Sequence, residues 1–172
     1  MFSNCTLLES VNIPSSVTSI GRNAFAYCHY LESVTIPSSV TNIGESAFED
    51  CRSLTTISIP SSVTSIGKRA FMDCYGLTSM YSFNPVPPQA GTYCFGYPDK
   101  FIPLYVPEGS AEAYRNAREW RNFKNIYEFD PTGISDVEAR ESGTSVWYDL
   151  SGRRHAAPVK GLNIVGGRKV MK

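Results

Sequence analysis

The chain has 172 residues, which suffices for one ordinary domain or for a repeat array with an appended segment. Its 16 basic and 16 acidic residues cancel, so no overall field attracts nucleic acid or an anionic membrane. No apolar run approaches the roughly 20 residues that a membrane-spanning helix needs. Charged residues make up only 19% of the chain while Ser, Thr and Tyr are plentiful, a composition common in proteins that work outside cells.

A repeat of 23 residues dominates the first part of the chain. Cysteines recur at this interval, at Cys5, Cys28, Cys51 and Cys74. The surrounding residues recur with them, so that the Ile-Pro pair at 36–37 returns at 59–60 and the Ile-Gly pair at 43–44 returns at 66–67. An interval of this length is typical of a solenoid, in which each unit covers the hydrophobic face of the next.

Each unit is predicted to form one coil with a strand on one side. In residues 31–36, inward Leu, Val and Ile alternate with Ser and Thr, as in a strand with one buried face. Pro37 removes a backbone donor and ends that strand. Val40 and Ile43 point inward again, and Gly44 is expected to permit a sharp bend. Residues 45–50 then have room for about one helical turn.

The first residues belong to this repeat and do not resemble a signal peptide. Residues 1–5 have neither a basic start nor an apolar stretch. Phe2 instead aligns with Phe25, Phe48 and Phe71. We therefore expect that the sequence begins inside a repeat and is a piece of a longer protein, so that the missing signal says nothing about location.

The open end of a solenoid needs a cover, and the sequence predicts one after Met80. Ser82 replaces the Ile of earlier units, and the proline-rich residues 84–88 break the period. Residues 101–106 are predicted to form a strand. Ser110 is a predicted helix N-cap, with Glu112 in the first turn, where the helix dipole favours an acid.

The predicted helix carries an apolar strip that is expected to lie across the last coil. Tyr114, Ala117 and Trp120 lie on one side of it, and the strip continues through residues 123, 126 and 129. A second boundary follows at residues 130–133, and residues 145–150 and 161–165 are predicted strands. We thus expect repeats over 1–82, a cap over 83–130 and a small β-rich module over 131–172.

The repeated pattern Ile-Pro-Ser-Ser-Val-Thr-x-Ile-Gly-x-x-Ala-Phe-x-x-Cys-x-x-Leu resembles the BspA-like class of leucine-rich repeats over roughly residues 1–82. The resemblance implies a leucine-rich repeat solenoid, β-rich with short helical turns, on a secreted or surface-attached bacterial protein that adheres to host or bacterial partners. Residues 105–126 resemble the terminal element that often follows such arrays. The ending, with residues 148–154 and 161–165, is similar to short C-terminal modules on exported proteins of anaerobic commensal bacteria, some of which are sorting signals.

The cysteines are predicted to be small core groups. Equivalent positions on successive coils lie in a line about 4.8 Å apart, so four thiolates do not converge on a metal ion. A disulfide between neighbouring coils is conceivable by distance, but side chains in register point in parallel, which favours buried, reduced thiols. Cys94 lies outside the period and is expected to be accessible, with oxidation or dimer formation as a minor alternative.

No catalytic residue, metal ligand or cofactor site is predicted, and we do not expect an enzyme. His29 and His155 have no partner that the sequence identifies and are expected at the surface. The carboxylates at 45, 49, 50 and 73 are expected to form a solvated rim. The basic residues at 153–154 and 168–169 form too small a patch, without interleaved aromatic residues, for nucleic-acid binding.

The outward side of the first strands is the candidate binding surface. Small hydroxyl groups in a parallel array suit an extended peptide or a glycan, although short polar residues also suit any strand face in water. The candidate residues are Ser10, Asn12, Ser33, Thr35, Thr56, Ser58, Ser79 and Tyr81. Four coils offer only about 300 Å² of strand face, whereas a standard interface needs about 800 Å² per partner. The tyrosines near the coil edges, at positions 27, 30, 75 and 81, are candidate anchors.

The sequence therefore favours a monomeric, non-enzymatic module that recognises an extracellular protein or glycan at a cell surface or after secretion. The alternative is a structural spacer that presents another domain and has no ligand of its own, because repeats this uniform also suit that role.

Overall fold

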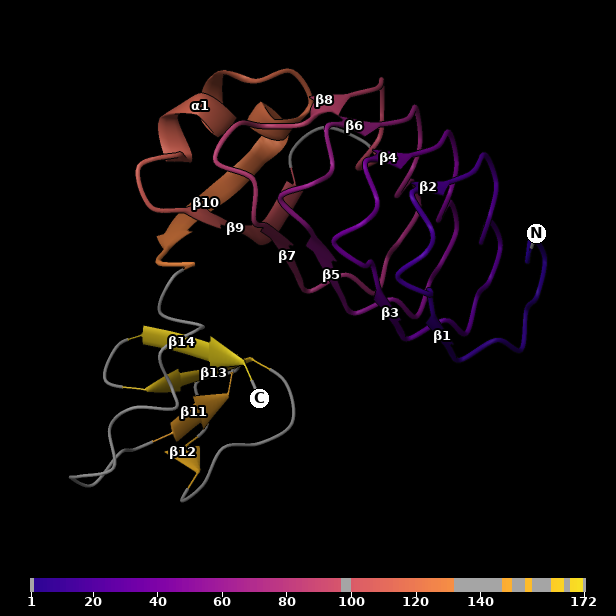
Figure 1. The fold of residues 1–172 in the computed structure, drawn as a ribbon, viewed down its shortest axis with the longest axis horizontal. Coiled ribbons are helices and arrows are strands. Elements are labelled where there is room, and N and C mark those ends of the chain that lie inside the picture. The colour runs from indigo at the N-terminus through magenta and orange to yellow at the C-terminus, as the bar shows by residue number, and fades with distance from the viewer. Residues whose placement is uncertain are drawn as a thin grey trace. The chain divides into compact units, whose positions relative to one another are not determined.

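The computed structural model describes residues 2–96 and 100–131 and four short strands between residues 147 and 171. The chain divides into two compact units, Met1–Glu128 and Phe129–Lys172, and each is described by itself. The first unit is a solenoid, so the predicted fold class is confirmed (Figure 1). The predicted boundaries at residues 82 and 130 stay predictions.

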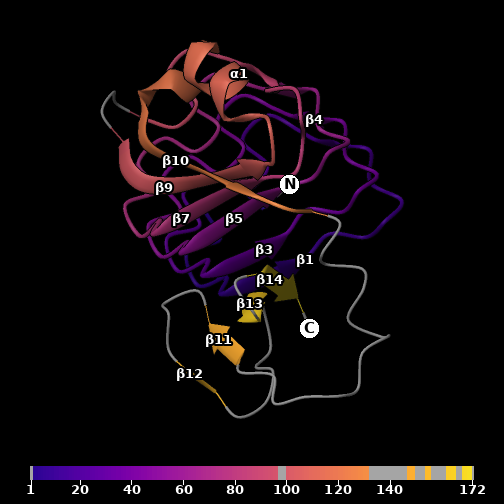
Figure 2. The same cartoon turned by 90° about the vertical axis from the view of Figure 1, so that its left-hand side faces the viewer.

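Two rows of parallel strands run along the solenoid. The first row holds β1 (Ser10–Asn12), β3 (Ser33–Thr35), β5 (Thr56–Ile59) and β7 (Ser79–Ser82). The second row holds β2 (Ser19–Ile20), β4 (Asn42–Ile43), β6 (Ser65–Ile66) and β8 (Gln89–Ala90). Figure 2 shows the strands of the first row side by side, with β1 paired to β3 and β5 paired to β7.

The strands pair at the interval that the repeat predicts. Ser10 pairs with Ser33 in the first row, and Ile43 pairs with Ile66 in the second. Between β3 and β5, the Thr55 amide donates to the Glu32 carbonyl oxygen at 3.3 Å. Equivalent side chains therefore stack in register from coil to coil.

The third side of each coil is built from β-turns, so the expected helical turn at residues 45–50 is wrong. Successive turns close with hydrogen bonds from Ala47 to Gly44 and from Glu49 to Ser46. Ser46 and Asp50 have φ of 54° and 61°, in the left-handed region, which a right-handed helix does not contain. The amides of Ser46, Phe48 and Asp50 donate to carbonyl groups of the next coil, so this side also joins the coils.

The repeated glycine stands at the start of a turn, as expected, but close packing between coils is what requires glycine there. A Cβ atom at Gly44 would lie 2.7 Å from the Arg22 amide nitrogen, and one at Gly67 would lie 2.4 Å from the Glu45 amide nitrogen. Neither glycine has a positive φ. At Gly21 in the first coil, a Cβ would meet nothing within 4 Å.

The solenoid continues past the proline-rich segment, where β8 and residues 91–96 complete the fourth coil. Ala90 pairs with Ile66, an interval one residue longer than the repeat. Phe95 then stacks on Phe71, with ring centroids 6.2 Å apart. Cys94 consequently lies in the core, fully buried, and our expectation that it is accessible is wrong. It occupies the place of Ala70 in the preceding coil, and its carbonyl accepts the Phe71 amide as that of Ala70 accepts the Phe48 amide.

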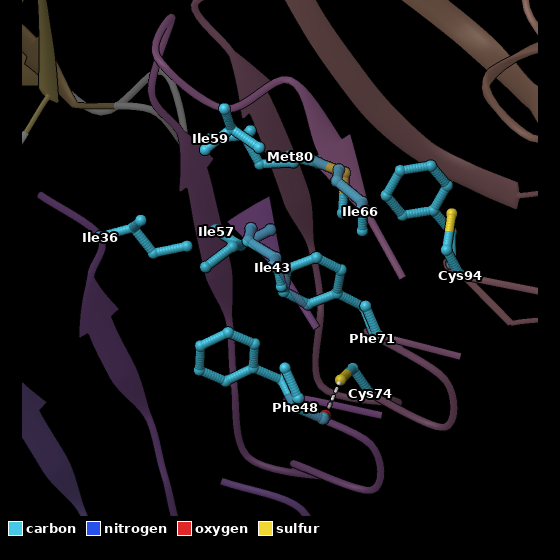
Figure 3. Close-up of a cluster of buried hydrophobic side chains, with 14 of the residues drawn as sticks. Ile36, Ile43, Phe48, Ile57, Ile59, Ile66, Phe71, Cys74, Met80 and Cys94 are labelled. Carbon is cyan, nitrogen blue, oxygen red and sulfur yellow. Dashed lines mark hydrogen bonds between the residues drawn. The ribbon is translucent and has the colours of Figure 1, made fainter. Parts of the chain in front are cut away.

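The interior is a set of stacked columns. The phenylalanine rings at positions 2, 25, 48 and 71 lie parallel, with neighbouring centroids 5.3–5.7 Å apart. Figure 3 shows part of this core, in which Ile43, Ile57, Ile66 and Met80 face one another. The columns explain why one unit cannot fold alone, since each side chain completes its burial against the next coil.

The last coil is covered by β9 (Lys100–Pro107), α1 (Ala111–Asn116), the 3-10 helix η1 (Trp120–Asn122) and β10 (Phe123–Phe129). β9 agrees with the predicted strand and pairs in parallel with β7. The predicted apolar strip is only partly helical, because α1 ends before Ala117 and the residues from Phe123 onward form a strand. Tyr114 and Trp120 are nevertheless fully buried, as a cover for the coil requires.

Ser110 takes the N-cap position but makes no side-chain capping bond. The Ala111 amide donates instead to the Glu128 carboxylate at 2.8 Å, and this contact keeps the pKa of Glu128 below its ordinary value. The helix start is thus capped from β10, by a residue far along the chain.

The second unit contains an antiparallel sheet. Its strands are β11 (Trp147–Asp149), β12 (Arg154–His155), β13 (Leu162–Val165) and β14 (Arg168–Met171), in the order β12-β11-β13-β14. β11 and β13 lie within the two predicted strands. The remainder of residues 132–172 lies outside the described part.

Candidate binding surface

The eight candidate surface residues lie in two rows along β1, β3, β5 and β7. Ser10 pairs with Ser33 and Thr56 with Ser79, while Asn12 pairs with Thr35 and Ser58 with Tyr81. The residues of the first two coils are exposed and those of the third are half-buried. Ser79 and Tyr81 are buried, at 9% and 2% exposure, so the candidate residues next to the cap are not accessible to a ligand.

Tyr81 belongs to an aromatic ladder that the sequence did not predict. Its ring stacks on Tyr105 at 4.7 Å, and Tyr105 packs against Tyr127 at 5.7 Å. Burial raises the pKa of Tyr81 well above its ordinary value. Tyr81 therefore joins the last coil to the cap and does not anchor a ligand, whereas Tyr127 is 52% exposed.

The repeated cysteines form the predicted interior column. Three of the thiols, those of Cys28, Cys51 and Cys74, donate to a phenylalanine carbonyl of the preceding coil, as Cys74 does to Phe48 at 3.1 Å (Figure 3). Burial raises the pKa of Cys51 to about 12. Cys5 is exposed, because no described coil precedes it. Thiols that donate to carbonyl groups act as core groups, and the described residues hold no group of three potential ligands for a metal ion.

Asp50 and His29 differ from what the sequence predicted. Asp50 is 8% exposed and not part of a solvated rim. Its carboxylate accepts two hydrogen bonds from Arg52, at 2.8 and 3.0 Å, and lies 2.9 Å from Nε2 of His29 in the neighbouring coil. The Arg52 guanidinium, followed by the His29 ring, holds the pKa of Asp50 below its ordinary value. The sequence could have indicated this ion pair, because an Asp stands two residues before an Arg. Asp is also one of the residues that adopt a left-handed backbone more readily than most.

The side of the solenoid that carries Asp50 and His29 also carries exposed aromatic side chains. Tyr75 is 75% exposed, and its hydroxyl donates to Asp73 at 2.9 Å. Tyr30 is 59% exposed and Tyr27 41% exposed. Three of the four tyrosines that we proposed as anchors are thus accessible.

A small apolar cavity of about 140 Å³ lies beside Tyr75, between the fourth coil and the cap. Its described lining includes Cys74, Leu77, Ile102 and Phe123 and contains no charged side chain. Sites for small ligands combine apolar walls with a few polar groups that fix the orientation of the ligand. The lining of this cavity offers few such polar groups.

Comparison with known proteins identifies the family of repeats to which the stacked coils belong. The sequence model of the BspA type leucine rich repeat region matches residues 1–118, in six copies. The chain belongs to the BspA-type leucine-rich repeat family. The match confirms the predicted resemblance and extends beyond residue 82, through the rest of the fourth coil and into the cap.

One solved structure that resembles this BspA-type chain is a leucine rich cell surface protein from Faecalibacterium prausnitzii A2-165. The two sequences are 43% identical where they align, over 51% of this chain and 23% of that protein, with a TM-score of 0.49. The chain thus spans about a quarter of the length of that relative. No curated protein matches the chain. No helix among the described residues is long and apolar enough to cross a bilayer.

Proposed function

We propose that this chain is a non-enzymatic recognition module of a secreted or surface-attached protein, which binds an extracellular protein or glycan through side chains on the outside of its coils. The observation that carries the proposal is the contrast between the inside and the outside of the stack. The interior columns keep the same residue types, whereas the residues at positions 29, 52 and 75 are His, Arg and Tyr. Variation at outward positions is what recognition on a constant scaffold requires.

The strand face supports the same proposal in its N-terminal half. Ser33 and Thr35 are exposed and in register with Ser10 and Asn12 of the coil before. Their short side chains leave room for a ligand to approach the strands. Membership of a family of surface repeat proteins fits an extracellular place of action.

A binding screen with matched variants tests the proposal. The chain is screened against immobilised extracellular-matrix proteins and a glycan array, alongside Ser33→Glu/Thr35→Glu. The control Ser38→Glu/Ser61→Glu adds the same charge at exposed residues of the turns between the two strand rows. We expect either the strand variant or a variant of the exposed residues Tyr30 and Tyr75 to weaken binding, while the control binds as the natural chain does.

A folded chain that binds no member of either panel would contradict the proposal and favour the alternative, a spacer that presents another domain. The uniform stacking of the phenylalanine and cysteine columns is the observation that keeps this alternative open.

A further inference from the structure

The tips of four stacked β-turns form a continuous row, which we call the turn ridge. Each turn is closed by a hydrogen bond from a leucine amide to the cysteine carbonyl three residues earlier, as from Leu31 to Cys28 at 3.1 Å. The flanking cysteine and leucine belong to interior columns, so the two central residues point outward. The turn ridge consists of Thr6, Leu7, His29, Tyr30, Arg52, Ser53, Tyr75 and Gly76.

Large exposed side chains gather on the turn ridge. Leu7, Tyr30 and Tyr75 are 83%, 59% and 75% exposed. Tyr30 and Tyr75 lie two coils apart, which is about 10 Å along the solenoid axis. The two residues thus lie on the turn ridge at a spacing that one extended ligand can bridge, and Arg52 belongs to the turn between them.

The polar groups of the turn ridge are held in place by two carboxylates beside it, Asp50 and Asp73. Arg52 and Asp50 form a two-point ion pair, joined by His29 at 2.9 Å. The Tyr75 hydroxyl is fixed on Asp73. Gly76 allows this turn to pack closely, since a Cβ there would lie 2.4 Å from the Arg52 carbonyl oxygen. With two carboxylates and one guanidinium, such a surface does not favour an anionic ligand, whereas the hydroxyl groups of a neutral ligand find both donors and acceptors.

The size of the turn ridge favours a small ligand. Four coils at about 4.8 Å give it a length of about 15 Å at the width of one turn, far below the roughly 800 Å² that each side of a standard protein interface buries. A sugar ring presents C–H bonds on one face, and these pack against the negative face of an aromatic ring. We infer that the turn ridge binds a neutral oligosaccharide, with sugar rings packed on Tyr30 and Tyr75 and hydroxyl groups bound by Arg52. This inference rests on the proposed recognition function and names its ligand class and site.

The test uses calorimetric and NMR titration of the full chain with three neutral hexasaccharides, from cellulose, mannan and laminarin, and with anionic hexagalacturonate. We expect at least one neutral hexasaccharide to bind in the millimolar range or tighter and to shift backbone signals of the turn ridge. Tyr30→Ala/Tyr75→Ala should weaken that binding by about tenfold or more, because two stacking contacts are lost. The control Tyr127→Ala removes a tyrosine of similar exposure in β10 and should leave binding unchanged.

The outcomes separate this inference from the proposed function. Equal binding by the double variant, with its fold verified by circular dichroism, would overturn the turn ridge as the site and leave recognition by another face standing. Binding of hexagalacturonate alone, or of a matrix protein and no neutral hexasaccharide, would overturn the ligand class. Loss of neutral hexasaccharide binding in the double variant and not in Tyr127→Ala would support the inference.

Discussion

The side-chain oxygen of Ser82 lies 2.6 Å from the phenol oxygen of Tyr114, and both residues are fully buried. Ser82 occupies the position at which Ile36 and Ile59 fill the core of earlier coils. The Tyr114 hydroxyl donates onward to the Asn84 carbonyl at 2.7 Å. The departure from the repeat at Ser82 therefore marks the point where a side chain of α1 enters the solenoid end.

Tyr114→Phe should destabilise the chain by about 1–3 kcal/mol, because the Ser82 hydroxyl and the Asn84 carbonyl lose a buried partner. Burial raises the pKa of Tyr114 to about 12, so the phenol is protonated and the loss should be equal at about pH 6 and about pH 8. Urea unfolding measures the difference. Tyr127→Phe, at an exposed tyrosine, is the control and should change stability by less than about 0.5 kcal/mol. Equal effects of the two variants would contradict the role of the buried phenol.

The repeated glycines offer a matched pair of substitutions. Gly67→Ala places a Cβ 2.4 Å from a backbone nitrogen of the preceding coil, so the coils must separate, at a cost of about 1–3 kcal/mol or more. Gly21→Ala meets no atom within 4 Å and should be neutral or slightly stabilising. Thermal unfolding of the two variants compares the same chemical change at equivalent positions. A Gly21→Ala variant as unstable as Gly67→Ala would show that backbone conformation, and not coil contact, selects glycine.

The sequence period was enough to predict the solenoid, because a repeated hydrophobic pattern fixes which side chains stack. It did not predict the turns at Ser46 and Asp50, since a left-handed backbone at a residue other than glycine is uncommon and is stabilised here by bonds to the next coil. Cys94 was misplaced because one inserted residue shifts the phase of the fourth coil after β7.

Two features of the candidate surface depend on contacts between distant parts of the chain. Tyr81 looked like an outward residue by its register, but Tyr105 of β9 stacks on it. Asp50 looked like a surface carboxylate, but Arg52 and His29 enclose it. A periodic pattern predicts the direction of a side chain and not what a later segment places over it.

Thiol labelling should divide the repeated cysteines by their place in the stack. Cys5 is exposed and should react quickly, whereas Cys28 and Cys51 are fully buried. Burial raises the pKa of Cys51 to about 12, so its reactive thiolate is scarce at about pH 8. Mass spectrometry after brief treatment with iodoacetamide measures each site, and full labelling in urea is the control. Rapid labelling of Cys51 in the folded chain would contradict an interior column.

The Asp50 carboxylate should make the stability of the folded chain fall as the pH becomes acidic. Arg52 and then His29 hold its pKa in the folded chain below the value of about 3.9 expected for an unfolded Asp. The stabilisation is therefore complete above about pH 4 and is lost as the pH falls through the folded pKa. Asp50→Asn, which tolerates the positive φ, should be less stable than the natural chain near neutral pH, and the difference should shrink in acid.

The equivalent residue of the next coil supplies the control for Asp50. Asp73 also has a positive φ, at 58°, but its carboxylate accepts a hydrogen bond from the Tyr75 hydroxyl instead of two from a guanidinium. Asp73→Asn should therefore lose less stability than Asp50→Asn at neutral pH, as measured by urea unfolding. A deficit of Asp50→Asn that grows toward acid pH would mean that the carboxylate is held in its protonated form, and the ion pair with Arg52 would not be what orders this part of the turn ridge.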